Sequence, residues 1–214
     1  MNVLVIGANG QIGNHLVKML GLSSEHHVHA MIRKEEQKAH MRELGADEIV
    51  LGDLEQDFSH AFKGIDAVIF TAGSGGHTGK EQTEAIDKKG AIQAVKEAES
   101  AGVKRFIMIS TIMADEAENA PENIQHYLSA KKAADDALRS TSLSYTILRP
   151  GPLSNDSATG MIKTAQKLDS YDGSISREDV AAAAVNSLVL EETFNKTFEL
   201  IGGTIPIGEA IKNI

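Results

Sequence analysis

The chain has 214 residues, of which 42% are hydrophobic and 24% are charged, as in ordinary globular proteins. Its net charge of −9 excludes binding to a nucleic-acid backbone as a main function, because that binding needs a basic surface. The absence of cysteine excludes disulfides, thiol nucleophiles and thiolate metal sites. No apolar run reaches the roughly 20 residues of a membrane helix, and no signal-peptide pattern is present. We therefore expect a cytoplasmic protein that does not bind membranes.

Short apolar runs alternate with helix-like segments from residue 2 to residue 150. The apolar runs predict strands at 2–7, 27–32, 48–52, 66–73, 104–110 and 144–150. The segments between them predict helices near 11–22, 34–44, 81–101 and 123–141. This alternation is typical of parallel βαβ units whose sheet is covered on both faces. With right-handed crossovers, it predicts an α/β fold with a doubly wound, mostly parallel sheet of the Rossmann type.

The alternation weakens beyond Pro150. Residues 151–160 have the composition of a loop. Residues 176–192 predict a helix that begins with a capping box, residues 196–202 predict a late strand, and a short terminal helix follows. We expect one domain over residues 1–214, in which residues 151–214 form a small cap on the substrate side.

Three glycines at positions 7, 10 and 13 follow the first strand and open into a helical pattern. In a strand–turn–helix unit, Gly7 would make the turn, Gly10 would admit phosphate groups, and Gly13 would let the helix pack closely on the strand. The alternative is a tight turn without a ligand. The βαβ context favours a dinucleotide whose pyrophosphate lies at the helix N-terminus. The loop residues expected to contact it also include Asn9, Gln11 and Ile12.

The residue after the second strand bears on which dinucleotide is bound. NAD sites usually place an acidic residue there, about 20 residues after the glycines. This chain has Arg33, with Lys34 beside it. A guanidinium suits a 2′-phosphate, so we favour NADP over NAD as the cofactor. The alternative is a solvated charge pair that Glu35 and Glu36 neutralise.

Two further loops are candidates for cofactor contacts. Asp53 and Leu54 follow the third strand, where they could flank the adenine. The loop after the fourth strand begins with small residues that would let the backbone approach the cofactor ribose, namely Thr71, Ala72 and Gly73. Its glycines suggest a mobile flap. His77 in that flap could contact the substrate, but we favour its interpretation as a solvated residue.

Tyr127 and Lys131 are four residues apart in a predicted helix and therefore share a face. An ammonium group there would lower the pKa of the phenol from its reference near 10. Such a tyrosine can exchange a proton with a carbonyl or hydroxyl group, and Lys131 can hydrogen-bond the nicotinamide ribose. Ser110 and Thr111 end the fifth strand at the ligand-binding edge, where either hydroxyl could orient the substrate oxygen.

Several segments carry a resemblance to a known family: GANGQIG, DL at 53–54, AGVKRFIMIST, YLSAK, YTILRPGPL and SREDVA. Together they resemble the short-chain dehydrogenase/reductase superfamily. The chain is similar to its atypical members, the NAD(P)H-binding, NmrA-like and flavin-reductase-like proteins, often named as sugar epimerases or dehydratases. The resemblance implies the cofactor contacts given above and an active centre of Ser110 or Thr111, Tyr127 and Lys131. It also implies a border to the nicotinamide formed by Pro150, Gly151, Pro152 and Leu153.

The sequence therefore predicts an NADP-dependent oxidoreductase that moves hydride to or from a small carbonyl or hydroxyl compound, as a monomer or homodimer. One alternative is a non-catalytic NAD(P)-sensing regulator, and another is a flavin- or quinone-type reductase without a catalytic tyrosine. An epimerase or dehydratase acting on a nucleotide-sugar is less favoured, because little chain follows Pro150. No metal site is expected, because His26, His27 and His29 have no evident acidic partner.

Overall fold

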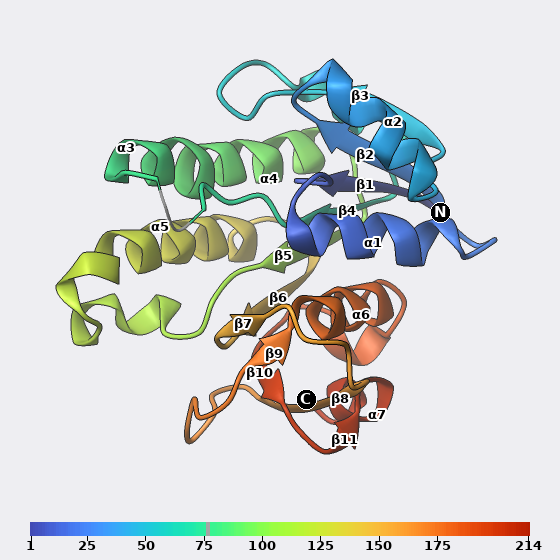
Figure 1. The fold of residues 1–214 in the computed structure, drawn as a ribbon. Coiled ribbons are helices and arrows are strands. Elements are labelled where there is room, and N and C mark those ends of the chain that lie inside the picture. Colours follow the sequence, from blue (N-terminus) through green and yellow to red (C-terminus); the bar gives the residue numbers. More distant parts are fainter. Residues whose placement is uncertain (76–77) are drawn as a thin grey trace.

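The computed structural model describes residues 1–75 and 78–214, and the predicted solvated residue His77 lies outside them. Within these ranges, nine strands form one sheet in the order β11-β8-β10-β6-β5-β4-β1-β2-β3 (Figure 1). Its parallel strands are β1 (Asn2–Ile6), β2 (His27–Ile32), β3 (Glu48–Leu51), β4 (Ala67–Phe70), β5 (Arg105–Ile109), β6 (Ser144–Pro150) and β10 (Lys196–Gly202). Strand β8 (Met161–Ala165) runs antiparallel to both β10 and β11 (Ile205–Pro206).

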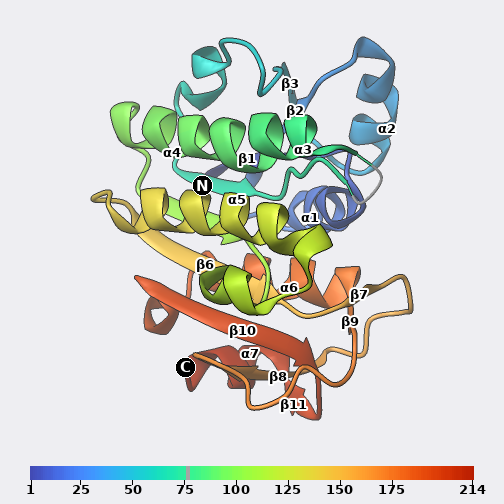
Figure 2. The ribbon, with the colours of Figure 1, turned by 90° about the vertical axis from the view of Figure 1, so that its left-hand side faces the viewer.

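Helices cover both faces of this sheet. The α-helices are α1 (Gln11–Gly21), α2 (Lys38–Glu43), α3 (Lys80–Gln82), α4 (Ala91–Ser100), α5 (Glu122–Arg139), α6 (Arg177–Ser187) and α7 (Ile207–Lys212). Short 3-10 segments are η1 (Glu35–Gln37), η2 (Ser59–Phe62), η4 (Ala114–Asn119) and η5 (Glu191–Thr193). The segment η3 (Thr83–Gly90) is a π-helix that joins α3 to α4. Figure 2 shows α4 and α5 lying across one face, while Figure 1 shows α1 and α6 on the other.

The central strands are mostly apolar because each face of the sheet has its own core. Alternate residues of a strand point to opposite faces. Val3 and Val5 of β1 pack into the core beneath α1, α6 and α7. Leu4 and Ile6 pack into the core beneath α4 and α5. The doubly wound, mostly parallel sheet predicted from the sequence is thus confirmed, and three strands, β2, β6 and β10, have the predicted bounds.

The chain beyond residue 150 is built differently from the predicted cap. Strands β8, β10 and β11 extend the central sheet, and α6 packs against α1. Only the parallel pair β7 (Leu153–Ser154) and β9 (Ile175–Ser176), outside the central sheet, remains as a small addition before α6. The sequence did not predict β8, because its five residues include exposed positions and depend on pairing with β10. Among the described residues, every helix is too short or too polar to cross a bilayer.

Candidate active site

The glycine loop brings β1, β4 and the start of α1 into close contact. Gly7 has φ of +89°, a conformation that favours glycine, and an added Cβ would lie 2.6 Å from the Ala72 nitrogen. A Cβ on Gly13 would lie 2.2 Å from the Gly7 oxygen, so only a glycine lets α1 approach the loop this closely. Gly10, the N-cap of α1, has no side chain to cover the first amide groups, and the first turn holds no acidic residue. The N-terminus of α1 therefore fits a pyrophosphate.

A cleft of about 1490 Å³ lies at the carboxyl ends of β1, β2, β3 and β4. This edge, where the strand order reverses between β1 and β4, is where open α/β sheets bind ligands. The cleft is larger than the sites of drug-sized ligands, which occupy about 300–1,000 Å³. The predicted cofactor residues that line it are Gly7, Asn9, Gly10, Gln11, Ile12, Arg33, Asp53, Leu54, Thr71, Ala72 and Gly73. The residues present thus fit a dinucleotide.

Other predicted site residues lie outside the lining of this cleft. Gly13 is buried beneath the loop, and Pro150 and Gly151 are buried where β6 ends. Pro152 and Leu153 are exposed beyond β6. Thr111 is half-buried after β5 and does not line the cleft either. A contact of these residues with the nicotinamide or substrate remains a prediction.

Tyr127 lines the cleft from the second turn of α5, and Asp87 of η3 lines it beside the tyrosine. Asp87 is only 1% exposed, and its Oδ2 accepts a hydrogen bond of 3.0 Å from the Ser74 backbone amide. Burial raises the pKa of the Tyr127 phenol, and the charges of Asp87 and Asp135 raise it further. The lowered pKa expected from the spacing to Lys131 is therefore wrong, and the phenol stays protonated at neutral pH.

Lys131 and Ser110 lie behind Tyr127 in a buried polar layer. The Lys131 ammonium is 3% exposed and donates a hydrogen bond of 2.8 Å to the Ile109 carbonyl at the end of β5. Burial lowers its pKa, although Asp87 and Asp135 oppose that change. The Ser110 hydroxyl donates to Asp135 over 2.9 Å. Neither group lines the cleft, and contact of Lys131 with the ribose and of Ser110 with the substrate remains a prediction.

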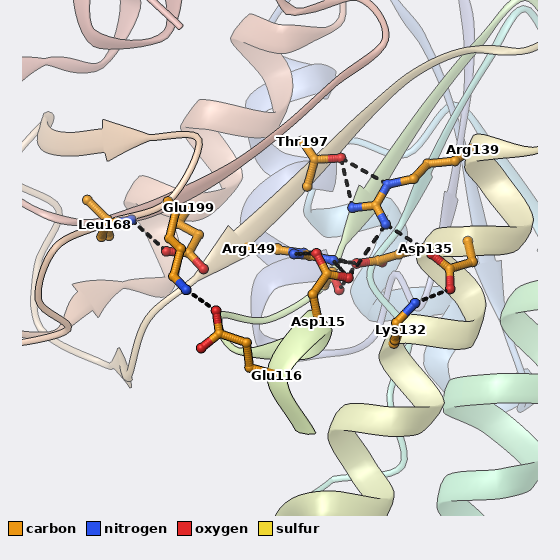
Figure 3. A network of polar contacts seen from close by, with 12 residues as sticks. Asp115, Glu116, Lys132, Asp135, Arg139, Arg149, Leu168, Thr197 and Glu199 are labelled. Carbon is orange, nitrogen blue, oxygen red and sulfur yellow. Dashed lines mark hydrogen bonds and ion pairs between the residues drawn. The ribbon is translucent and has the colours of Figure 1, made fainter. Parts of the chain in front are cut away.

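Asp135 and Arg149 form the centre of this buried layer (Figure 3). Asp135 is fully buried, and its Oδ2 accepts hydrogen bonds from Arg149 Nε and NH2 over 3.0 and 2.8 Å. Arg149 also forms a bidentate pair with Asp115 over 2.6 and 3.0 Å. Burial raises the pKa of Asp135, although Arg149 and Ser110 oppose that change. The network ties α5, β5, β6 and η4 together directly behind the tyrosine.

The Asp115–Arg149 pair predicts an acid-dependent contribution to stability. Hydrogen bonds from Arg149 lower the pKa of Asp115 from 3.8 to about 2. A depressed carboxyl pKa stabilises the fold above the unfolded value, and the gain is lost as pH falls through the folded value. We expect the free energies of unfolding of wild type and Asp115→Asn to differ at pH 6 and to converge between pH 5 and pH 2. Urea unfolding at several pH values checks this, and parallel curves would contradict it.

Sequence reasoning missed Asp87 and Asp135, although both carry a recognisable signal. Asp87 lies on the same buried helical stripe as Ala91 and Ala94. Asp135 likewise falls on the stripe that contains Leu128 and Leu138. A carboxylate on an apolar helical stripe is rarely fully buried unless it is paired or serves a site. That pattern marks both residues as candidates for function.

Comparison with known proteins assigns residues 7–190 to the NAD(P)H-binding family. The uncharacterized sugar epimerase YhfK of Bacillus subtilis is 46% identical over 217 residues, which cover 100% of both chains. A solved Bacillus halodurans protein, named as a candidate NAD-dependent epimerase/dehydratase, has a TM-score of 0.97 at 46% identity and covers 100% of both chains. The oxidoreductase ylbE of Lactococcus lactis has a TM-score of 0.86 at 28% identity and covers 100% of this chain and 96% of its own.

The comparisons agree with the geometry of the cleft. The family match includes the glycine loop, the end of β2, Tyr127 and the start of α6. The homologues extend over the whole chain, including the strands that lengthen the sheet beyond β6. On both grounds, the chain belongs to the NAD(P)H-binding family, with the Rossmann fold of the atypical short-chain dehydrogenases/reductases.

Proposed function

We propose that the protein is an NADP-dependent reductase that acts on a small carbonyl compound. The observation that carries the proposal is the phenol of Tyr127 in the wall of a cleft whose glycine loop fits a dinucleotide. Bound NADPH would supply a hydride to the carbonyl carbon. Hydride addition leaves an alkoxide oxygen, which is a stronger base than a phenolate. Tyr127 would donate its phenolic proton to that oxygen, and the cleft would then return a proton to the phenolate from water.

The protonated state of Tyr127 at neutral pH suits reduction, because reduction needs a proton donor at the substrate oxygen. A proton donor must be protonated before the reaction, and burial next to Asp87 keeps this phenol neutral. Oxidation of an alcohol requires the phenolate as a base. Burial and the nearby carboxylate of Asp87 disfavour the phenolate. Lys131 and Ser110 would act from behind the site, by fixing the end of β5 and the position of α5. Their role would be to position Tyr127 without contact to the substrate.

The proposal is tested by NADPH oxidation at 340 nm with a panel of aldehydes, ketones, quinones and flavins. Turnover with an aldehyde or a ketone is the expected result. A regulator that only senses NAD(P) would instead bind NADPH and turn over none of the panel. The buried ion-pair network behind Tyr127 does not distinguish these two functions, because it serves stability in both. Turnover of flavins or quinones alone would support the reductase without a catalytic tyrosine.

Arg33 carries the preference for NADP within this proposal. It is exposed at the end of β2 and lines the cleft, whereas Lys34 beside it does not. We expect Arg33→Ala to weaken NADP binding by about tenfold to a hundredfold, the range of a lost charge-assisted hydrogen bond, with little effect on NAD. Lys34→Ala is the matched control and should leave both affinities unchanged. Calorimetric titration measures the ratio, and an unchanged NADP/NAD ratio in Arg33→Ala would exclude the role.

A further inference from the structure

Arg177 stands where the main cleft meets a second cavity of about 490 Å³. It is the first residue of α6, which lies beside α1 (Figure 1). Four residues line both spaces, namely Asn9, Gly10, Gln11 and Arg177. Three of these belong to the glycine loop and the start of α1. The guanidinium of Arg177 is therefore the one basic group among the described residues that borders both spaces beside the glycine loop.

The surroundings of Arg177 hold it in place. The Ser176 hydroxyl caps α6 by accepting a hydrogen bond of 2.9 Å from the Asp179 amide. The Asp179 carboxylate in turn accepts hydrogen bonds from the backbone amides of Thr159 and Gly160, over 3.0 and 2.8 Å. Arg177 NH1 donates a hydrogen bond of 2.8 Å to Asn155 Oδ1, a neutral acceptor. These hydrogen bonds fix the start of α6, but none of them gives Arg177 a negatively charged partner.

The charges along the cleft indicate what that partner is. The cations that line its described part are Arg33, Lys80 and Arg177. Arg33 lies at the end of β2, where the 2′-phosphate is expected, and Lys80 begins α3. No described ion pair neutralises Arg177: Asp156 and Glu178, which line the second cavity with it, form no ion pair with it, and neither does Asp179. A pyrophosphate at the N-terminus of α1 carries two negative charges, and the first turn of α1 contains no basic side chain to balance them.

We propose that Arg177 binds the pyrophosphate of the dinucleotide and that Asn155 positions it for this contact. The inference rests on the proposed function only in that the cleft holds NADP(H). A guanidinium is suited to the task because its planar donors match phosphate oxygens bidentately. The pyrophosphate would then lie between the amides of α1 and a side chain from α6. This contact would link the C-terminal part of the chain to cofactor binding.

The test compares three ligands by isothermal titration calorimetry: NADP, NAD and 2′-AMP, which has the 2′-phosphate and no pyrophosphate. We expect Arg177→Ala to weaken the binding of NADP and the binding of NAD by the same factor, about tenfold to a hundredfold. Binding of 2′-AMP should stay within twofold of wild type. Arg42→Ala removes the same charge from an exposed position on α2 outside the cleft and should change none of the three. Asn155→Ala should weaken both dinucleotides by a smaller factor.

Two results would overturn the inference. The first is that Arg177→Ala binds NADP and NAD with affinities within twofold of wild type. The second is that Arg177→Ala loses as much affinity for 2′-AMP as it loses for the dinucleotides. If Arg177→Ala does not fold, as judged by circular dichroism, the affinities of Asn155→Ala for the same three ligands are compared with those of wild type. Unchanged dinucleotide affinities, or an equal loss for 2′-AMP, would then overturn the inference. A wild-type chain that binds neither dinucleotide would overturn the proposed function as well. A chain that binds NADP without turnover would overturn only the reductase proposal, and the Arg177 comparison would still decide its own question.

Discussion

Replacing Tyr127 by phenylalanine is expected to lower kcat about 10²–10⁴-fold with a carbonyl substrate, the range of a lost acid–base group. The substitution removes the hydroxyl and keeps the ring packed against the cluster of Ala117, Ala120 and Leu128, so the fold and the NADP affinity should stay close to wild type. Tyr171→Phe is the matched control. Its phenol also has a raised pKa, of about 12, but its hydroxyl donates to Glu199, and the residue does not line the cleft. Steady-state NADPH oxidation at saturating cofactor measures the difference.

The pH profile provides a second measurement of the same role. A general acid is active while protonated, so the rate falls as pH rises through its pKa. Because burial and Asp87 raise the pKa of Tyr127 above its ordinary value of 10, kcat/KM for reduction should show no descending limb from this group below pH 10. A tyrosine activated by Lys131 would give a fall closer to neutral pH. Turnover that survives Tyr127→Phe unchanged would instead favour the flavin- or quinone-type reductase.

The parts of the fold that the sequence predicts well are those encoded by local patterns. The glycine loop follows directly from the spacing of Gly7, Gly10 and Gly13 after an apolar strand. Close packing by Gly13 is found as predicted, since any side chain there would meet the Gly7 carbonyl. Arg33 lies in the cleft because the carboxyl end of a parallel strand fixes the place of the residue after it. In each case, a few neighbouring residues determine the geometry.

The parts that the sequence does not predict depend on contacts between distant segments. The spacing of Tyr127 and Lys131 places both on one helix face, but it does not reveal that Lys131 turns to the Ile109 carbonyl. It also does not reveal the burial of Tyr127, which raises the pKa of the phenol instead of lowering it, nor Asp87 of η3, whose charge raises that pKa further. Strand β8 likewise exists only through its pairing with β10 and β11. Electrostatics and edge strands of this kind are set by tertiary structure.

The buried carboxylate of Asp135 should be among the residues on which stability depends most. Asp135→Ala is expected to lower the free energy of unfolding by about 3–5 kcal/mol, because it breaks the buried ion pair of Asp135 with Arg149. Arg149 keeps its pair with Asp115, while Ser110 loses the acceptor of its hydroxyl. Asp136→Ala removes the neighbouring carboxylate, which is half-exposed and pairs with Lys132 and Arg139 at the surface. That control should cost only about 0–1 kcal/mol.

Urea unfolding followed by far-ultraviolet circular dichroism measures both variants, provided that the slope with denaturant is unchanged. Asp135→Asn separates charge from hydrogen bonding, since its amide oxygen can still accept from Arg149 or Ser110, and it should fall between Asp135→Ala and wild type. Asp135 does not line the cleft, so NADP affinity in the folded fraction should be retained. Equal losses in Asp135→Ala and Asp136→Ala would contradict the network of Figure 3 as a source of stability, because burial is what distinguishes the two carboxylates.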